Sequence, residues 1–191
     1  MDYIKKLVGD RIFLSPIVNS EDEIEKFTKW MNDFQVTDYT GRTSQIINYL
    51  GEKEFLENAS KESSKYSFDI VDLTSNQLIG TVSFDKIDWI TRKATLGIFI
   101  GDPDYRSHGY GTEAIKLLLD YGFNYLNLNS VQLELLGVNE RAHKCYYKCG
   151  FKDVGRYREA AYLNGKYYDK CLMDILKSDF NEECIRNKNV K

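Results

Sequence analysis

Long apolar runs are absent from this sequence, and no stretch approaches the roughly 20 residues that a membrane-spanning helix needs. The first residues, Met-Asp-Tyr-Ile-Lys-Lys, lack the apolar centre of a secretory signal peptide. Internal repeats, low-complexity tracts and linkers are missing as well. We therefore expect one cytoplasmic domain that does not enter a membrane. The 191 residues, 42% of them hydrophobic, suffice for one sizeable core.

Cysteine is scarce, at four residues. Cys145 and Cys149 are spaced by one helical turn, Cys171 lies in a predicted strand, and Cys184 is near the C-terminus. Such scattered cysteines do not form a disulfide framework, so we expect free thiols in a cytosolic chain. His143 with Cys145 and Cys149 offers a conceivable zinc site, but the ligands are too few and their spacing matches no common zinc pattern. No metal is expected.

Neither sign of charge dominates the chain, because 26 Lys and Arg stand against 29 Asp and Glu. The basic stripe that usually marks nucleic-acid-binding domains is missing, so direct binding of nucleic acid is not expected. The net charge of −3 is compatible with a cationic amine as substrate.

The most informative segment spans residues 105–114, Tyr-Arg-Ser-His-Gly-Tyr-Gly-Thr-Glu-Ala. It follows an apolar, β-branched run at 95–100 and precedes an amphipathic segment at 113–125, which predicts a strand, a turn and a helix. Gly109 and Gly111 allow the backbone to turn tightly and to approach a ligand closely. Successive N–H groups and the positive end of the helix then form a cradle for phosphate.

The spacing of this loop narrows the choice of phosphate ligand. The third glycine of the dinucleotide pattern and the terminal Gly-Lys-Ser/Thr of the mononucleotide loop are both missing. What is present is Arg-x-x-Gly-x-Gly, from Arg106 to Gly111. Alone, this short pattern also fits an ordinary strand-to-helix turn with a solvated arginine. Glu113 is taken as structural, since an acid at a helix start complements the helix dipole.

A second segment, residues 139–151, predicts a helix with Asn139 at its N-cap and Gly150 just past its end. Its pattern Asn-x-x-Ala-x-x-x-Tyr-x-x-x-Gly-Phe, after a strand and together with the Arg-x-x-Gly-x-Gly loop, resembles the GNAT superfamily of acetyl-CoA-dependent N-acetyltransferases. Both ends of the chain resemble the ribosomal-protein and spermidine acetyltransferase branch, at residues 10–16 and 29–33 and at residues 155–160 and 164–169. The resemblance covers about nine-tenths of the chain.

The pattern of hydrophobic and turn residues predicts a mixed α/β order, β-α-α-β-β-β-α-β-α-β-β. Strands are predicted at 11–16, 66–72, 78–85, 93–101, 130–136, 152–162 and 166–176, helices at 21–32, 46–61 (one or two), 113–125 and from 139, and a loop at 33–45. The resemblance implies a central mixed sheet of about seven strands, flanked by helices and splayed open between its fourth and fifth strands. We expect a single domain at residues 1–178 and a disordered polar tail at 179–191.

The resemblance implies acetyl-CoA as co-substrate, bound by the loop, the preceding strand and the second segment. The implied contacts are Phe99, Ile100, Gly101, Arg106, Ser107, His108, Gly109, Tyr110, Gly111, Thr112, Asn139 and Ala142. Arg106 is assigned to the pyrophosphate, and Asn139 both caps its helix and meets an amide of pantetheine. His108 either contacts phosphate or is simply exposed. Backbone N–H groups of the splayed strand would polarise the thioester carbonyl.

Transfer of acetyl to an amine also needs a proton donor for the leaving thiolate. The resemblance implies Tyr146, seven residues after Asn139, as this general acid. The alternative is an aromatic side chain that packs against the sheet. Tyr147 competes for the role, but it points about 100° away along the helix.

A proton acceptor is needed because a primary amine, with a pKa near ~10, costs about 4 kcal/mol to present in neutral form at pH 7. The resemblance implies Glu134 as the base, in the strand five residues before Asn139. Alternation along that strand places Gln132 and Glu134 on one face, which either lines the cleft or meets solvent. Asp85 and Asp88 are further options, as is a water chain without a dedicated base.

The acceptor remains open between the α-amine of a protein N-terminus, a polyamine or other small amine, and an amino sugar or aminoglycoside, and the likeness to the ribosomal-protein branch favours the first. Its pocket is expected from the 33–45 loop, the following helix and the terminal hairpin, where Asp38, Tyr39, Arg158, Glu159 and Tyr167 stand. A non-catalytic acyl-CoA-binding or sensory module, and transfer of another acyl group such as succinyl, are the alternatives. The resemblance also implies a homodimer.

Overall fold

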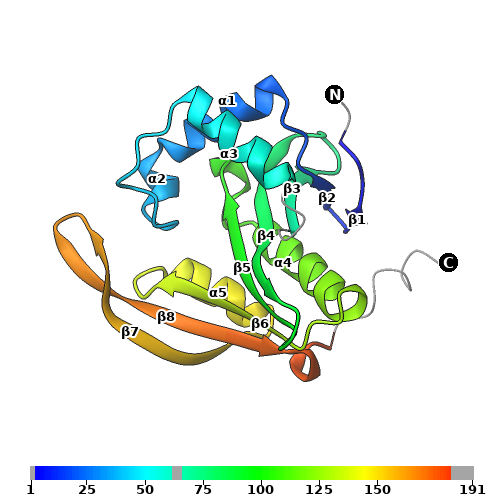
Figure 1. Cartoon of the computed structure of the whole chain (residues 1–191), viewed down its shortest axis with the longest axis vertical. Helices are drawn as coiled ribbons and strands as arrows, with labels where there is room; N and C mark the ends of the chain where they lie inside the picture. Colours follow the sequence, from blue (N-terminus) through cyan, green and yellow to red (C-terminus); the bar gives the residue numbers. More distant parts are fainter. Residues whose placement is uncertain (1–2, 62–65, 182–191) are drawn as a thin grey trace.

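The computed structural model describes residues 3–61 and 66–181. Its strands form one sheet in the order β1-β2-β3-β4-β5-β6-β8-β7 (Figure 1). The strands are β1 Leu7–Val8, β2 Ile12–Pro16, β3 Tyr66–Asp72, β4 Leu78–Asp88, β5 Lys93–Ile100, β6 Ser130–Leu136, β7 Lys152–Leu163 and β8 Lys166–Leu176. The predicted mixed sheet is confirmed. It has eight strands in its described part where about seven were expected, because two residues of β1 pair with β2.

The helices are α1 Glu21–Met31, α2 Phe34–Thr37, α3 Tyr49–Lys61, α4 Tyr110–Asp120 and α5 Glu140–Lys148, and α4 continues as a π-helical turn, Tyr121–Tyr125. Ser20 caps α1 as predicted, through a capping box with Glu23. The loop predicted at 33–45 was wrong in part, because it contains α2. The Asp33 side chain accepts a hydrogen bond from Gln35 N at 2.9 Å and so starts this short helix.

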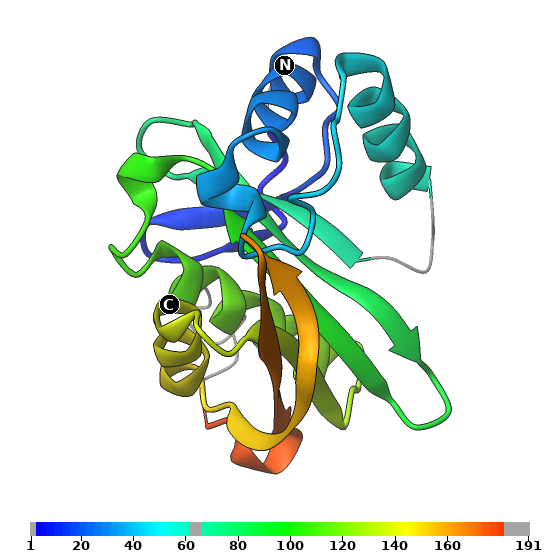
Figure 2. The same ribbon diagram turned by 90° about the vertical axis from the view of Figure 1, so that its left-hand side faces the viewer.

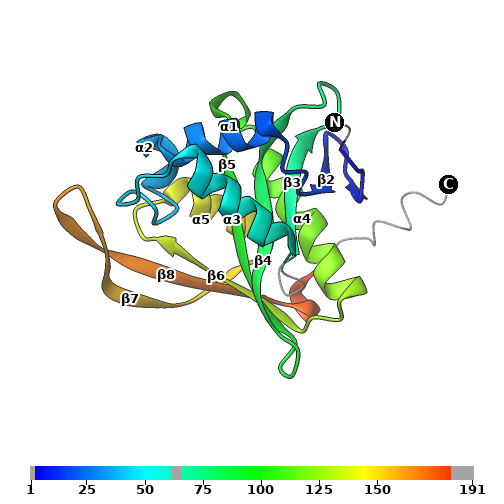
Figure 3. The same ribbon diagram turned by 45° about the horizontal axis from the view of Figure 1, so that its top comes forward.

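Helices cover both faces of the sheet (Figure 3). The larger core lies on the α4 face, where Ile115 and Leu118 pack among residues of seven strands, including Ile79 of β4. A smaller cluster on the opposite face joins Phe27 of α1 and Leu56 of α3 to the strands. Successive strand residues point to opposite faces, so β4 contributes Ile79 to the larger core and Leu78 to the smaller one.

The sheet is split between β5 and β6, as the resemblance implied. Within the described chain these strands pair in parallel at three positions, from Lys93 opposite Ser130 to Thr95 opposite Gln132. Beyond Thr95 they separate, because β5 follows β4 while β6 follows β8. Figure 1 shows the resulting V, and Figure 2 looks into its open side, with α1 and α3 above it and α5 and the β7–β8 hairpin below.

The last two strands that the structure describes, β7 and β8, form the predicted hairpin. Asn164 and Gly165 form its turn with φ values of 50° and 79°, the left-handed conformation that this residue pair favours. The first residues of the predicted tail pack on the domain, where Asp179 accepts a hydrogen bond from Lys152 and Phe180 contacts Phe123. Residues 182–191 lie outside the described residues, so their disorder stays a prediction. Over the described ranges, no helix has the length and apolarity that crossing a membrane requires.

Candidate active site

A cavity of about 910 Å³ occupies the opening between β5 and β6. One part is lined by the loop before α4 and by α5, through residues such as Ser107, Gly111 and Ala142. Another part is lined by the α1–α3 layer, including Phe27 and Phe55. The cavity therefore joins the predicted phosphate-binding loop to the face of the sheet that carries the α1–α3 layer.

The loop presents the free N-terminus of α4 to this cavity. Gly109 is the N-cap residue and has a φ of +88°, which explains why a glycine is required there. The first backbone bond of the helix runs from Glu113 N to Gly109 O at 3.1 Å. The N–H groups of Tyr110, Gly111 and Thr112 precede it, so the helix itself offers them no acceptor. They are available to an anion.

Gly111 differs from Gly109 because the fold itself tolerates a side chain there. Its φ is not positive, and a Cβ would lie 3.8 Å from side-chain atoms of Ile98 and Ile100, an ordinary contact distance. The space beside Gly111 thus opens onto the cavity between β5 and α5. Such a bare backbone position allows a bulky ligand to come close.

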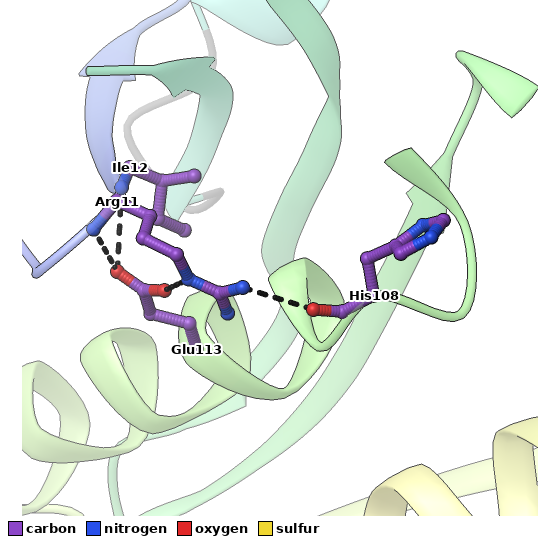
Figure 4. Close-up of polar contacts among 4 residues, drawn as sticks. All are labelled: Arg11, Ile12, His108 and Glu113. Carbon is purple, nitrogen blue, oxygen red and sulfur yellow. Dashed lines mark hydrogen bonds and ion pairs between the residues drawn. The ribbon is translucent and has the colours of Figure 1, made fainter. Parts of the chain in front are cut away.

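An ion-paired clamp holds this loop (Figure 4). Glu113 accepts hydrogen bonds from Arg11 N at 2.8 Å, Arg11 Nε at 3.0 Å and Ile12 N at 3.3 Å. Arg11 Nη1 donates to His108 O at 2.9 Å, and its guanidinium lies 4.5 Å from the centre of the Tyr110 ring. The structural role predicted for Glu113 is confirmed, but Arg11 was missed. It joins the start of β2 to the α4 loop.

Three predicted cofactor contacts lie outside the cavity lining. Gly101 is buried, its N–H bonds to Ile79 O at 2.9 Å, and its C=O accepts from Arg106 Nη2 at 2.6 Å. Its backbone groups are therefore bonded within the fold, and its assignment as a cofactor contact stays a prediction. His108 is exposed and turns its ring away from the clamp (Figure 4), and Tyr110 packs against Tyr105 at 5.0 Å. Their side-chain contacts with phosphate stay predictions.

The remaining predicted contacts line the cavity, namely Phe99, Ile100, Arg106, Ser107, Gly109, Gly111, Thr112, Asn139 and Ala142. Arg106 braces the loop, since its Nε also donates to Ile100 O at 3.1 Å. Asn139 caps α5 as predicted, and its Oδ1 accepts from Ala142 N at 3.1 Å. The Nδ2 group of Asn139 can therefore donate to another acceptor. The acceptor predicted for it is an amide of pantetheine.

The register of β5 against β4 decides which backbone groups face the opening. Gly101 bonds to Ile79, so the alternating residue Phe99 also turns its backbone groups toward β4. Ile98 and Ile100 then direct theirs toward the gap in the sheet. Ile98 was not predicted as a contact. Its role depends on which alternate residues of β5 bond to β4. The register between the two strands decides this, and it cannot be read from the sequence of β5 alone.

Tyr146 lies at the cavity and Tyr147 is exposed outside it, as the helical spacing predicted. Tyr146 is 8% exposed, lines the cavity and packs edge-on against Phe151. Burial raises the pKa of its phenol above the ordinary value, with further contributions from Cys145 and Cys149. Tyr147 is 64% exposed and stacks on His143. Tyr146 is thus the phenol at the cavity, and its raised pKa keeps it protonated.

Cys145 is a nucleophilic group in the same wall. Its Sγ lies 3.2 Å from Thr112 Oγ1, and it lines the cavity. The hydrogen bond from Cys149 lowers the pKa of the Cys145 thiol to about 7, with a further contribution from Thr112 against the opposing effect of burial. The cysteines of the described residues, Cys145, Cys149 and Cys171, are free as expected, and Cys184 lies outside them.

No group of three metal-ligating side chains occurs among the residues that the structure describes. The conceivable zinc ligand His143 instead bonds through Nε2 to Asp153 Oδ1 at 3.0 Å. This contact ties α5 to β7.

Glu134, the predicted base, lines the cavity and is exposed. Lys170 Nζ lies 3.2 Å from its Oε2, so its charge is already compensated. Asp85 also lines the cavity, whereas Asp88 lies outside the lining and binds the turn at Ile90 and Thr91. Of the acidic options, the structure thus brings Asp85 and Glu134 to the cavity.

The α1–α3 layer contributes polar groups that were not predicted. Arg42 lies over the Phe55 ring at 4.6 Å, and Glu52 is buried beside the cavity. Burial raises the pKa of Glu52, and Arg42 opposes this effect. Of the acceptor-pocket residues that were predicted, Tyr39 lines the cavity, while Asp38, Arg158, Glu159 and Tyr167 do not. Sequence patterns of amphipathic helices do not distinguish a cavity wall from ordinary surface.

A sheet opened between two strands, with a phosphate-binding helix start at one end of the gap, is the arrangement expected of the GNAT acetyltransferase class. The model of the family described as "Acetyltransferase (GNAT) domain" matches residues 11–152. The chain therefore belongs to the GNAT acetyltransferase family.

Similar proteins support this assignment. The chain is 32% identical over 185 residues to a probable N-acetyltransferase, YjcK, of Bacillus subtilis, covering 91% of this chain and 98% of that protein. It is 34% identical over 111 residues to spermidine N(1)-acetyltransferase of Vibrio cholerae, but this match spans 58% of this chain and 64% of the relative, less than two thirds of it. The crystal structure of Vibrio cholerae spermidine N-acetyltransferase in complex with CoA and spermine superposes with a TM-score of 0.80 at 25% identity, covering 90% and 98% of the two chains.

Proposed function

We propose that this protein transfers an acetyl group from acetyl-CoA directly to a primary amine, within one ternary complex. The observation that carries this proposal is the placement of three features on one cavity. These are the free N–H groups at the start of α4, the backbone edge of β5 that lacks a partner strand, and the buried phenol of Tyr146. Membership of the GNAT family supports it.

The residues of the cavity fit coenzyme A. The N–H groups of Gly111 and Thr112 would bind the pyrophosphate, together with those of Ser107 and Gly109 in the loop. Ile98 and Ile100 would pair with the amides of the pantetheine arm, and Asn139 Nδ2 would donate to the same arm. The open space beside Gly111 supports this fit, since the fold itself does not require a glycine there.

Acetyl-CoA would supply the reactive thioester. The backbone N–H of Ile98 would stabilise the negative charge that develops on the carbonyl oxygen. Tyr146 would donate its phenolic proton to the departing sulfur. Its hydroxyl has no hydrogen-bond partner among the described residues, which leaves the proton available to a ligand. The proton lost by the amine would pass to a carboxylate of the cavity, for which Glu134 is the predicted candidate.

The acceptor that we would test first is a polyamine. The relatives named for spermidine, at 34% identity by sequence and 25% by structure, support this choice over a protein N-terminus or an amino sugar. The carboxylate of Asp85 in the cavity lining, which is bonded to the neutral hydroxyl of Ser83, is compatible with a cationic acceptor. A protein N-terminal α-amine, the acceptor that the likeness to the ribosomal-protein branch favoured, becomes the second candidate.

The deciding experiment incubates the purified protein with acetyl-CoA and a panel of polyamines, diamines, amino sugars and N-terminal peptides. Mass spectrometry of the products is expected to show addition of one acetyl group to a primary amine, with release of CoA. Tight binding of acetyl-CoA by calorimetry without turnover of any amine would instead support a non-catalytic acyl-CoA-binding module. A parallel series with succinyl-CoA tests the acyl preference.

We also propose that the protein is cytoplasmic, forms a homodimer and makes no direct contact with nucleic acid. Fractionation of cells, light scattering of the purified protein and a salt-dependent DNA-binding assay test these three points.

A further inference from the structure

A bulge in β4 redirects one carboxylate toward the cavity. Ser83 pairs with Gly97 and Phe84 with Leu96, but the next pair joins Lys86 to Thr95, so Asp85 is the extra residue. Bulges of this kind re-aim a side chain and are frequent beside active sites. Asp85 is exposed and lines the cavity.

The missing side chain of Gly97 makes room for this carboxylate. A Cβ on Gly97 would lie 2.8 Å from Asp85 Oδ2 and 3.2 Å from Ser83 Oγ. The carboxylate of Asp85 therefore lies directly over the backbone of β5. The Ser83 hydroxyl donates to Asp85 Oδ1, which leaves Oδ2 as the oxygen nearest to Gly97.

The position of Gly97 along β5 places Asp85 at the narrow end of the V. Thr95 is the last residue of β5 that pairs with β6, and Gly97 is two residues beyond it. The pyrophosphate would be bound at the other end of this strand, by the loop that follows Ile100. An acyl-CoA arm that runs back along β5 would thus bring its thioester toward Gly97.

Two carboxylates, those of Asp85 and Glu134, lie at this level of the gap between β5 and β6, on the same face of the sheet. Gln132 Nε2 donates to Thr95 Oγ1 at 3.2 Å, so these two side chains share a face, and Glu134 shares it by alternation. Glu134 is paired with Lys170. Among the described residues, the polar partner of Asp85 is the neutral hydroxyl of Ser83, and no ion pair engages it.

We propose that Asp85, rather than Glu134, is the catalytic residue that accepts the proton of the attacking amine. This role depends on the proposed acetyl transfer. The amine N–H bond breaks, its proton goes to Asp85 Oδ2, and the nitrogen lone pair forms the bond to the acetyl carbon. The C–S bond breaks and the sulfur takes the proton of Tyr146. Gly97 and Ser83 are positioning residues, because they act through the carboxylate.

The test compares Asp85→Asn with Glu134→Gln and with Asp88→Asn, using spermidine or whichever amine the panel identifies. Asp85→Asn is expected to lower kcat/KM about 100-fold at pH 7 while the affinity for acetyl-CoA stays within a few-fold. The deficit is expected to narrow toward pH 10, where solvent deprotonates the amine. Asp88→Asn is the matched control on the same strand, outside the cavity, and is expected to match the unmodified protein.

Gly97→Ala provides an independent variant that keeps both carboxylates. Its Cβ would displace the Asp85 side chain, so kcat/KM is expected to fall at least 10-fold with acetyl-CoA affinity retained. In the Asp85→Asn background the same substitution should add little further loss, because both changes remove one interaction. Additive losses would contradict the proposed role.

The outcomes separate this inference from the proposed function. No acetyl-CoA binding and no turnover by the unmodified protein would overturn both. Turnover by the unmodified protein with an undiminished rate in Asp85→Asn would overturn the role of Asp85 alone. The role of Asp85 is also overturned if Glu134→Gln shows the 100-fold, pH-dependent deficit and Asp85→Asn does not.

Discussion

At the scale of single residues, the cavity depends on positions where a small side chain leaves room for a larger group. Gly109 satisfies a backbone requirement through its φ of +88°. Gly111 and Gly97 satisfy requirements of space, at the phosphate loop and beside Asp85. These different causes lead to different expected effects of substitution.

Gly111→Val is expected to weaken acetyl-CoA binding at least 10-fold with little change in the stability of the fold. The reason is that the added methyl groups fill the cavity, whereas the backbone at this position is unstrained. Calorimetry with acetyl-CoA and a thermal melt of the free protein measure the two effects. Gly111→Ala is the matched control and should lose less affinity. Unchanged affinity in the valine variant would contradict the placement of the cofactor.

Tyr146→Phe is expected to lower kcat about 100-fold with little change in KM for either substrate, because the phenol acts on the leaving sulfur. Steady-state kinetics on the amine identified by the panel measure this split. Tyr147→Phe serves as the control, since that side chain is exposed and outside the cavity. An equal effect of both substitutions would argue against the assignment of Tyr146.

Cys145 is expected to react with iodoacetamide with a midpoint near pH 7, since its thiol pKa is lowered to about 7. Acetyl-CoA should slow the reaction because the sulfur lines the same cavity. Peptide mass spectrometry of the labelled protein measures the rate at each pH. Cys171 is 4% exposed and provides the internal comparison. Equal labelling of the two cysteines would contradict this expectation.

At the scale of elements, the α4 loop is held by a contact between segments that are far apart in the sequence. Arg11 and Glu113 are 102 residues apart, yet their hydrogen bonds fix the distance between β2 and the first turn of α4. The loop therefore meets a ligand in one conformation. This preorganisation lowers the entropic cost of binding an anion.

Glu113→Ala is expected to lower the free energy of unfolding by about 2–3 kcal/mol, since three hydrogen bonds to a charged side chain are lost. It should also weaken acetyl-CoA binding, although Glu113 itself would not contact the ligand. Chemical unfolding and calorimetry measure the two effects. Glu140→Ala removes an exposed ion pair on α5 and is the control. Unaltered acetyl-CoA affinity in Glu113→Ala would mean that the loop keeps its conformation without the clamp.

At the scale of the whole molecule, a buried carboxyl pair joins the α1 layer to the sheet. Asp69 of β3 and Glu23 of α1 are both buried, and Asp69 Oδ1 and Glu23 Oε1 each lack a described hydrogen-bond partner. Burial raises the pKa of Asp69 well above its ordinary value, and the charge of Glu23 adds to this effect. Val18 N donates to Asp69, and Tyr3 and Asp22 lie near Glu23. A proton on Asp69 would satisfy both unpartnered oxygens.

The sign of the resulting pH dependence follows from proton uptake. Between the unfolded pKa of Asp69, near ~4, and its higher folded pKa, the folded state binds the extra proton. The free energy of unfolding therefore falls as the pH rises through this window. Asp69→Asn should remove this contribution, because an amide can donate to Glu23 and accept from Val18 at any pH. Urea unfolding at pH 5 and pH 8 measures the free energy of unfolding of the unmodified protein and of Asp69→Asn. An equal change between the two pH values in both proteins would contradict this prediction.

Much of the fold follows from local patterns, as the Ser20 cap and the Asn164-Gly165 turn illustrate. The short helix α2 escaped prediction because four residues carry too little periodicity. Within the site, the spacing of Asn139 and Tyr146 was sufficient to predict that Asn139 caps α5 and that Tyr146 is the tyrosine at the cavity, because both belong to one helix. Arg11, Ile98 and the cavity-facing position of Asp85 were not predictable, because they arise from a long-range ion pair, a strand register and a bulge. These features depend on how distant segments meet.

The short pairing of β5 with β6 has a consequence for how the molecule responds to its co-substrate. An arm of amides laid against Ile98 would act as a temporary ninth strand and complete a sheet that the polypeptide leaves unfinished. Hydrogen exchange at the amides of Ile98 and Ile100 should then slow sharply when acetyl-CoA is added, while the paired amide of Gly101 changes little. The free protein would carry an edge inside its sheet, at Ile98, whose hydrogen-bonding groups can pair with a small molecule.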